Sequence, residues 1–212
     1  MSSAECEASM LAEIREQGKL LRRVLPRCRA EIEEKCATGA AGCLHLVGCG
    51  DMYFAASQVA ALGALLWGLP TRAWRSMELR WAHPQLGADD LVVCASVSGR
   101  TPRTLEAALL ARRAGARVLG ITDNPGAPLD DALEETLILG TTALELLGNK
   151  PYAGYRHIIA QTQTFTAVLA AELVLAATLK GAGADLAGIP ARVGYLVGAL
   201  DAPARELAGV FF

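Results

Sequence analysis

Five neighbouring residues form the part of this sequence best suited to chemistry. They are Ser96, Ser98, Gly99, Arg100 and Thr101. Three of them carry hydroxyl groups, which donate hydrogen bonds to anions, and the arginine adds a positive charge. A buried strand is predicted just before them and a helix just after them, so unpaired backbone N–H groups and the positive end of a helix dipole would point at this turn. The segment therefore predicts a phosphate-binding loop.

The same residue types also occur in ordinary turns, which leaves a second interpretation open. Serine, glycine and threonine are common turn residues, and Thr101 followed by Pro102 suits an N-cap and the first position of a helix. Arg100 would then be a solvated side chain rather than an anion ligand. A second loop suited to ligand binding beside this one would favour the phosphate-binding interpretation over the ordinary turn.

A second unusual turn follows another predicted strand and reads Gly48-Cys49-Gly50-Asp51. Its glycines suggest a dinucleotide-binding loop, but Tyr53 stands where the third glycine of that motif belongs, and the next strand leads into Arg75 instead of an acidic residue. We therefore expect no dinucleotide and no other cofactor. The glycines instead allow a smaller ligand to approach the backbone, in a pocket lined by Gly48, Gly50 and Asp51.

Two further side chains have both a functional and a structural interpretation. Glu78 comes just after a predicted strand, at the edge where open α/β sheets bind ligands, and it is the candidate acid for catalysis. It also fits an exposed acid that binds backbone N–H groups of a helix. His45 alternates into an apolar strand, where a histidine with structural partners is expected rather than a metal ligand.

The alternation of short apolar runs with helical segments predicts the fold class. Strands over 43–47, 71–74, 91–95, 117–122 and 135–139 alternate with helices, which indicates parallel crossover units. The fold is therefore expected to be α/β, a flavodoxin-like doubly wound parallel sheet of about five strands. In the expected strand order 2-1-3-4-5 the order reverses between the first and third strands, and ligands of such sheets bind at that point. The glycine turn and the serine loop are therefore predicted to converge on one ligand site.

The first 40 residues predict a helical arm outside this sheet. Apolar residues recur among charges with helical spacing over 10–24, interrupted at Gly18. Pro26 is predicted to break the helix, because proline cannot donate the backbone hydrogen bond that a helix interior needs. A second, more charged helix is predicted over 27–36.

The C-terminal third predicts one long helix and a less regular end. The helix is expected over 158–180, with Thr162 near its start, where the hydroxyl either faces the ligand pocket or bonds locally. A glycine-rich link and a short helix over 190–200 follow. The apolar residues 207–212 predict the opening of another buried strand.

Composition describes a globular protein and excludes several classes. The 212 residues are 52% hydrophobic and 20% charged, with a net charge of −2, which suits a packed core. No basic stripe with interleaved aromatic residues occurs, so no nucleic-acid partner is expected. The longest apolar segment, 165–179, carries Glu172 and is too short for a membrane span, so a buried helix and no membrane partner are expected.

The cysteines indicate a reducing compartment. None of the six stands in C-x-x-C spacing, and several lie inside apolar runs, so they are expected as small buried side chains. No zinc site is expected. The polar, acidic N-terminus lacks the pattern of a signal peptide, so the protein is expected in the cytoplasm.

These features together resemble one known family, the sugar isomerase (SIS) superfamily. The helix segment Glu13-Ile14-Arg15-Glu16-Gln17, the turn Gly48-Cys49-Gly50 and the loop 96–101, which is similar to an S-x-S-G-x-T phosphate loop, occur in its order and spacing. Within the superfamily the chain resembles the first SIS unit of the isomerase part of glucosamine-6-phosphate synthase and related aminosugar-phosphate isomerases and deglycases. The resemblance implies that Ser96, Ser98 and Thr101 hold a sugar phosphate.

The resemblance also implies an activity, a domain division and a partner. The ligand would be fructose 6-phosphate or glucosamine 6-phosphate, and the activity that of an aldose-ketose or aminosugar-phosphate isomerase. Relatives carry two SIS units, with the proton-transferring residues mainly in the second. Residues 41–180 would then be one unit and 181–212 a linker and the start of another, with a homodimer or a tandem SIS unit as partner. We expect the chain alone to bind the sugar without isomerising it.

Departures from the family pattern leave one alternative open, a non-catalytic phosphosugar sensor or regulatory module. Asp51 and Met52 stand where the family usually has serine or threonine, and glutamines flank Thr162 where it has S-T-K. The proton-transfer candidates in this chain are Glu78, Glu145 and His157. None has both a paired acid and a favourable position, since a base must reach both carbons between which the proton moves.

Overall fold

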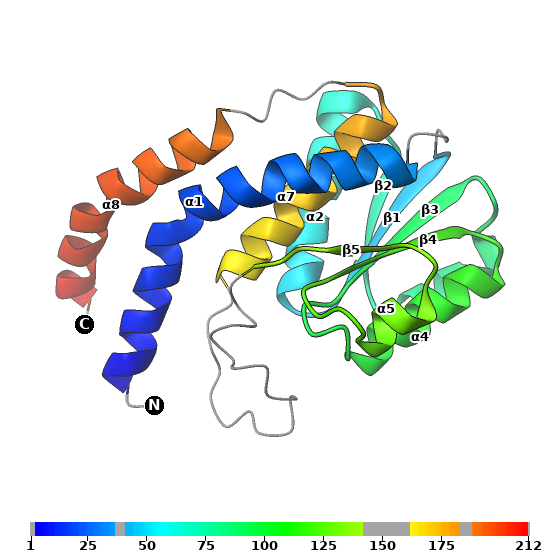
Figure 1. Cartoon of the computed structure of the whole chain (residues 1–212), viewed down its shortest axis with the longest axis horizontal. Coiled ribbons are helices and arrows are strands. Elements are labelled where there is room, and N and C mark those ends of the chain that lie inside the picture. The colour runs from blue at the N-terminus through cyan, green and yellow to red at the C-terminus, as the bar shows by residue number, and fades with distance from the viewer. Residues whose placement is uncertain (1–2, 37–40, 142–161, 183–187, 212) are drawn as a thin grey trace.

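The structure is a computed structural model, and it describes residues 3–36, 41–141, 162–182 and 188–211. It shows a β-sheet covered by helices on both faces, with two helices extending to one side as an arm (Figure 1). The helices are α1 (Ser3–Cys36), α2 (Asp51–Trp67), α3 (Leu79–Ala82), the 3-10 helix η1 (His83–Gln85), α4 (Pro102–Arg113), α5 (Pro128–Ala132), α7 (Thr162–Leu179) and α8 (Ile189–Phe211).

The predicted doubly wound parallel sheet is confirmed. Its strands are β1 (Cys43–Gly48), β2 (Thr71–Arg75), β3 (Asp90–Ala95), β4 (Arg117–Thr122) and β5 (Thr136–Ile138). Every neighbouring pair is parallel, and the strand order is β2-β1-β3-β4-β5, as the sequence predicts. β1 and β3 are almost entirely buried, because a parallel sheet with helices on both faces has no face left for water.

Two hydrophobic clusters hold the helices onto the sheet. Leu46 and Val93 pack with residues of α1, α2 and α7, whereas Val47 and Val92 pack with residues of α3, α4 and α5. Successive residues of a strand point to opposite faces, so each central strand contributes to both clusters. The arm helix α1 therefore shares the core of the domain.

α7 is the central core helix. It packs between α1 and α2, and most of its residues are buried. Among the helices of the described residues it alone has the length and hydropathy of a membrane span, but 61% of that window lies buried inside the domain. The prediction of a buried helix here is confirmed.

α1 is one continuous helix, so the predicted interruptions at Gly18 and Pro26 are wrong. Pro26 lies on the solvent side, where a carbonyl group without its helical partner can be hydrated. Leu25 and Cys28 are buried on the other side and hold the helix together across the proline. Gly18 faces α8, where a Cβ atom would lie 2.8 Å from the carbonyl oxygen of Pro190, so the glycine permits a close helix contact.

The C-terminal segment is also helical, and the predicted strand over 207–212 is wrong. α8 runs from Ile189 to Phe211, past the end of the short helix predicted over 190–200. A short apolar run cannot distinguish strand from helix by periodicity, and here it continues the helical spacing of the residues before it. α8 lies beside the N-terminal half of α1, away from the sheet (Figure 1). The division into 41–180 and 181–212 stays a prediction.

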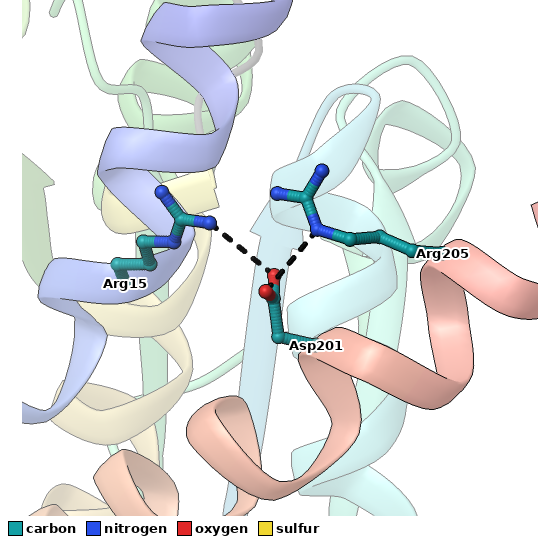
Figure 2. Close-up of polar contacts among 3 residues, drawn as sticks. All are labelled: Arg15, Asp201 and Arg205. Atoms are coloured by element: carbon teal, nitrogen blue, oxygen red, sulfur yellow. Dashed lines mark hydrogen bonds and ion pairs between the residues drawn. The ribbon is translucent and has the colours of Figure 1, made fainter.

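An ion-pair cluster joins the two helices of the arm. The carboxylate of Asp201 in α8 lies 3.4 Å from the guanidinium of Arg15 in α1 and 3.2 Å from that of Arg205 (Figure 2). The hydrogen bond from Arg205 is the main reason that the pKa of Asp201 lies below its usual range. All three side chains are exposed, so these pairs orient the helices more than they stabilise them.

Two other charged residues of α1 attach the arm to the domain. Glu13 is buried and accepts the N–H and the hydroxyl of Thr162 at 2.9 and 2.8 Å, which caps α7. Arg27 donates to the carbonyl oxygens of Ile138 and Leu139 at the end of β5. The arm thus contacts the domain at the carboxyl end of β5 as well as through its core.

Candidate functional site

The structure brings the two predicted loops together. The register of β1 and β3 pairs Gly48 with Ala95, and the next residue of each strand begins a loop. The glycine turn over 48–51 and the serine loop over 96–101 therefore leave the sheet side by side. This is the point where the strand order reverses, the position at which open α/β sheets bind ligands.

The serine loop is compact and mostly buried. Ser96 shares a hydrogen bond of 3.0 Å with the hydroxyl of Thr101, and the hydroxyl of Ser98 accepts the N–H of Arg100 at 3.2 Å. Gly99 has a φ of +63°, in the left-handed region that suits glycine, and its N–H donates to the Ser96 carbonyl group at 2.8 Å. The side chain of Arg100 is exposed.

Hydroxyl protons of this loop remain available to a ligand. Ser96 and Thr101 share one hydrogen bond, which uses the proton of one hydroxyl and leaves the other proton without an acceptor among the described residues. Ser98 uses only a lone pair, since its partner is an N–H donor. The loop also precedes α4 and so lies at the positive end of its helix dipole. Pro102, the first residue of α4, has no N–H, and the Thr104 N–H donates to the Thr101 carbonyl group at 3.1 Å. This arrangement can bind an anion.

The glycine turn has a different character. A Cβ atom on Gly48 would lie 2.6 Å from that of Met52, so glycine allows α2 to start close to the sheet. Gly50 is the N-cap of α2, with a φ of +55° and no side chain to cap the helix. Asp51 is exposed and places a negative charge there, which suits sugar hydroxyls better than a phosphate group.

A third loop at this edge was missed by the sequence reasoning. Ser76, which follows β2, is buried and shares a hydrogen bond of 2.9 Å with the hydroxyl of Thr104 in α4. That hydroxyl also lies 3.9 Å from the sulfur of Cys49, and the N–H of Ser76 donates to the Gly48 carbonyl group at 3.0 Å. These contacts link the loop after β2 and the glycine turn to α4, the helix that follows the serine loop. The available signal was the position of Ser76 directly after a strand.

Glu78 lies at this edge but is already bound. Its carboxylate accepts a hydrogen bond from the Arg75 guanidinium at 3.0 Å and another from the Arg75 backbone N–H at 3.2 Å. The side-chain hydrogen bond is the main reason that the pKa of Glu78 lies below its usual range. A general base works best with a pKa near the working pH, so these contacts fit the structural interpretation of an acid that binds backbone N–H.

Thr162 lies at the start of α7, where Glu13 accepts its N–H and its hydroxyl. Within the described part of the chain, no hydrogen bond joins Thr162 to the serine loop or the glycine turn. Helical spacing around Glu13 gives no signal for this partner, because the two residues are 149 positions apart. Glu145 and His157, the other proton-transfer candidates, lie outside the described residues.

A second polar cluster lies at the opposite, amino end of the sheet. Nδ1 of His45 accepts the indole N–H of Trp74 at 3.0 Å, and Nε2 lies 3.6 Å from the carboxylate of Asp90. The indole nitrogen can only donate, so Nδ1 holds the lone pair and Nε2 carries the proton. Burial is the main cause that lowers the pKa of His45. The prediction of a histidine with structural partners is confirmed.

The ligand chemistry of this cluster argues against a cation. Cys43, His45 and Asp90 place their polar atoms within 4.8 Å of one another, beside a cavity of about 270 Å³. Metal binding needs a lone pair on the histidine nitrogen that faces the ion, but Nε2 carries the proton here. Arg72 also lines the cavity and adds a positive charge.

Comparisons of the sequence with known proteins give one family. The family model described as SIS domain matches residues 41–177. The enzyme glutamine--fructose-6-phosphate aminotransferase (isomerizing) of Thermus thermophilus is 31% identical over 173 residues, which cover 79% of this chain and 27% of that protein. The chain therefore spans about a quarter of the length of this curated relative.

Solved structures show the same fold. The C-terminal domain of glucosamine-fructose-6-phosphate aminotransferase from Francisella tularensis matches with a TM-score of 0.69 at 19% identity, over 98% of this chain and 60% of that chain. Tagatose-6-phosphate ketose/aldose isomerase from Escherichia coli matches with a TM-score of 0.66 at 19% identity, over 90% and 53%. At these identities the likeness concerns the architecture.

Proposed function

Because the chain belongs to the SIS domain family, we propose that it binds a phosphorylated sugar or aminosugar at the carboxyl edge of its sheet. The phosphate ligands are the loop residues Ser96, Ser98, Gly99, Arg100 and Thr101. The residues that line the rest of the pocket are Gly48, Gly50, Asp51 and Thr162. The observation that carries the proposal is the pairing of Gly48 with Ala95, which starts both loops at one point of the sheet.

The charges and donors of the two loops support a ligand with one anionic end. The serine loop offers free hydroxyl protons, the N-terminus of α4 and the Arg100 guanidinium, all of which favour a phosphate. The glycine turn offers backbone groups and the Asp51 carboxylate, which favour hydroxyl or amino groups. A hexose 6-phosphate presents both kinds of group at opposite ends.

We further propose that the chain is part of an aldose-ketose or aminosugar-phosphate isomerase that acts on fructose 6-phosphate or glucosamine 6-phosphate. The names of its relatives support this activity, since they are enzymes of fructose and tagatose 6-phosphates. The alternative of a non-catalytic sensor is not favoured by these comparisons. Arg75 occupies the Glu78 carboxylate, so we expect this chain alone to bind the sugar without isomerising it.

The proposed partner is a second copy of the chain or a tandem SIS unit, and the proposed location is the cytoplasm. α8 exposes a set of large apolar side chains, each more than half exposed, and such a surface favours burial against a partner. Its members are Tyr195, Leu196, Leu200 and Leu207. Cys28 and Cys36 are buried free thiols, which suits a reducing compartment.

Calorimetry of sugar-phosphate binding tests the phosphate ligands. Replacing Ser96 and Ser98 together with alanine is expected to weaken binding of glucosamine 6-phosphate by about 1–3 kcal/mol, the range for hydrogen bonds to charged groups. Ser57→Ala is the matched control, because the Ser57 hydroxyl bonds only a carbonyl group within its own helix, at 2.8 Å. It should leave the affinity unchanged.

Two results would contradict the proposal in different ways. Equal affinity of the double variant and the unmodified protein would show that the serines are only turn residues. Absence of binding of both glucosamine 6-phosphate and fructose 6-phosphate to the unmodified protein would reject a phosphosugar function. Unphosphorylated glucosamine serves as the control ligand, since it lacks the group that the serine loop is proposed to hold.

A further inference from the structure

The end of β4 binds the backbone of the serine loop through hydrogen bonds to its carbonyl groups. Thr122, the last residue of β4, is fully buried, and its hydroxyl donates to the carbonyl oxygen of Val97 at 3.1 Å. The same hydroxyl oxygen accepts the backbone N–H of Asn124 at 3.2 Å. One side chain thus ties the loop to the turn that follows β4.

Three consecutive carbonyl groups of the loop are held by this region. Besides the Thr122 hydroxyl, the donors to Val97, Ser98 and Gly99 are the N–H of Asp123 (3.0 Å), the side-chain amide of Asn124 (3.3 Å) and the N–H of Leu129 (3.0 Å). Carbonyl oxygens carry partial negative charge and repel a phosphate. In a trans peptide the next N–H points opposite to the carbonyl group, so this orientation of the Val97 carbonyl group turns the Ser98 N–H toward the ligand side. The Gly99 and Arg100 N–H groups donate inside the loop, to the Ser96 carbonyl group and the Ser98 hydroxyl.

The loop also packs tightly on Thr122. A Cβ atom on Gly99 would lie 2.9 Å from the Thr122 hydroxyl and 2.5 Å from the Cβ of Ala127. Gly99 itself has a φ of +63°, which glycine alone adopts at little cost. The conformation of the loop therefore depends on the shape and the hydroxyl of Thr122 together.

We infer that Thr122 is a positioning residue of the phosphate loop. Its hydroxyl holds the Val97 carbonyl group away from the ligand, so that the Ser98 N–H and the Ser96 and Ser98 side chains keep the orientation that an anion needs. The inference rests on the proposed function for its ligand. The orientation of the loop itself can be measured without one.

Three variants separate the hydroxyl from the rest of the side chain. Thr122→Val keeps the shape and removes the hydroxyl. It is expected to weaken glucosamine 6-phosphate binding roughly tenfold, because the Val97 carbonyl group loses one of its two donors and the Asn124 N–H loses its acceptor. Thr122→Ser keeps the hydroxyl and should restore most of the affinity. Thr136→Val is the matched control on the next strand, since the Thr136 hydroxyl is buried and has no hydrogen-bond partner among the described residues.

Amide hydrogen exchange of the loop gives a second readout in the absence of ligand. The Gly99 and Arg100 amides, which donate within the loop, should exchange faster in Thr122→Val than in Thr136→Val, while amides of β1 stay protected in both. Should Thr122→Val fail to fold, Asn124→Ala removes only the side-chain donor to Ser98 and is expected to weaken binding about two- to threefold.

The outcomes distinguish this inference from the proposed function. Equal affinity and equal loop exchange in Thr122→Val and Thr136→Val would overturn the positioning role. If Thr122→Val does not fold, equal affinity of Asn124→Ala and the unmodified protein would overturn it. Faster loop exchange in Thr122→Val, with no sugar-phosphate binding by the unmodified protein, would keep the positioning role and reject the ligand. Loss of affinity in Thr122→Val with recovery in Thr122→Ser would support both.

Discussion

Each end of the sheet carries a cluster of polar residues, and the two clusters differ in how many hydrogen bonds they can still offer a ligand. At the carboxyl end, Ser96, Ser98 and Thr101 bond one another and their own loop, yet hydroxyl protons remain free. At the amino end, both ring nitrogens of His45 have partners, Trp74 and Asp90. Unused hydrogen-bond capacity, rather than residue type, separates the candidate ligand site from the structural cluster.

The direction of the strands explains why the two ends differ. In a parallel sheet each strand enters a loop at its carboxyl end, and that loop leads to the N-terminus of a helix with free N–H groups. β3 leads in this way into α4 through the serine loop. The amino ends receive the chain from helix C-termini, where the free groups are carbonyl oxygens. The carboxyl edge is therefore the natural anion site.

Replacing Gly99 with alanine should have the largest effect on the carboxyl end. The added Cβ would lie 2.5 Å from that of Ala127, at a φ of +63° that alanine disfavours. We expect the free energy of unfolding to fall by about 2–4 kcal/mol, measured by urea denaturation, because overpacking and backbone strain add.

Gly126→Ala is the matched control for this prediction. Gly126 has a φ of +71°, but apart from its two chain neighbours no atom of the described residues lies within 4 Å of the position of its Cβ. It should therefore lose only the conformational part, about 1 kcal/mol. Equal losses in the two variants would show that the serine loop is not closely packed against β4, and the contrast between the two ends of the sheet would weaken.

Much of the sheet and of its loops was predictable, because the signals are local. β-branched apolar runs mark the strands, and the turns after β1 and β3 carry glycine and serine in recognisable patterns. The parallel strand order then follows from the alternation of strands and helices. Periodicity and turn chemistry are properties of neighbouring residues, which a sequence displays directly.

The features that escaped prediction depend on partners far along the chain. Pro26 sits inside a continuous helix because buried residues before and after it in the sequence hold the helix against the core. The apolar residues 207–211 continue a helix that packs on α1. The contact of Ser76 with Thr104 and the capping of Thr162 by Glu13 join separate elements. No local sequence pattern predicts these long-range hydrogen bonds, because each of the residues alone resembles an ordinary polar surface residue.

Glu172 differs from the polar groups at both ends of the sheet, because it is buried and also lacks a hydrogen-bond partner among the described residues. It is fully buried in α7, and neither carboxylate oxygen has a hydrogen-bond partner among the described residues. Burial raises its pKa well above the ordinary value of 4.5, which favours the protonated form in the folded protein. Glu172→Met is expected to raise the free energy of unfolding at pH 8 by roughly 1–3 kcal/mol, since it replaces a buried polar group with an apolar one of similar size.

The pH dependence of this effect follows from the direction of the shift. With the folded pKa above the unfolded value, the contribution of Glu172 to stability is fully present below about pH 4.5 and is lost as pH rises through the folded pKa. The difference between Glu172→Met and the unmodified protein should therefore be larger at pH 8 than at pH 4. Glu172→Gln should remove the pH dependence. A pH-independent difference would mean that the carboxyl group has a partner.

Trp74→Phe tests the amino end with a smaller expected effect. It removes the indole donor to His45 Nδ1, which should cost about 1 kcal/mol of unfolding free energy. Burial lowers the His45 pKa below 6.5, so neutral His45 contributes stability above that pH, and this is lost as pH falls through the folded pKa. Without a donor that requires the neutral ring, the His45 pKa should rise, as measured by an NMR titration.

Trp81→Phe provides the control for the tryptophan variant. The Trp81 side chain is 68% exposed, so its replacement should change neither the stability nor the His45 titration measurably. An unchanged His45 pKa in Trp74→Phe would show that the indole does not select the protonation state of the ring. The interpretation of His45 as a structural residue whose ring nitrogens both have partners would then be wrong.

Zinc is expected to have no effect on the melting temperature. This expectation tests whether the polar cluster at the amino end of the sheet is structural and not a ligand site. Cys43, His45 and Asp90 have the residue types of a zinc site and lie close together. A neutral imidazole has one ring proton, however, and ligation through Nε2 would move it to Nδ1. Two donors, Nδ1–H and the Trp74 indole, would then face each other, and the hydrogen bond between them would be lost.

The remaining partners of the cluster add to this barrier. Asp90 already accepts the N–H of Gly87 at 2.9 Å, and Arg72 lines the same cavity with a positive charge. An equimolar amount of zinc should therefore leave the melting temperature unchanged. Trp74→Phe frees Nδ1 to carry the proton, so zinc stabilisation confined to that variant would support the argument. Stabilisation of the unmodified protein that disappears in Cys43→Ser would reverse it and make the amino end a second ligand site.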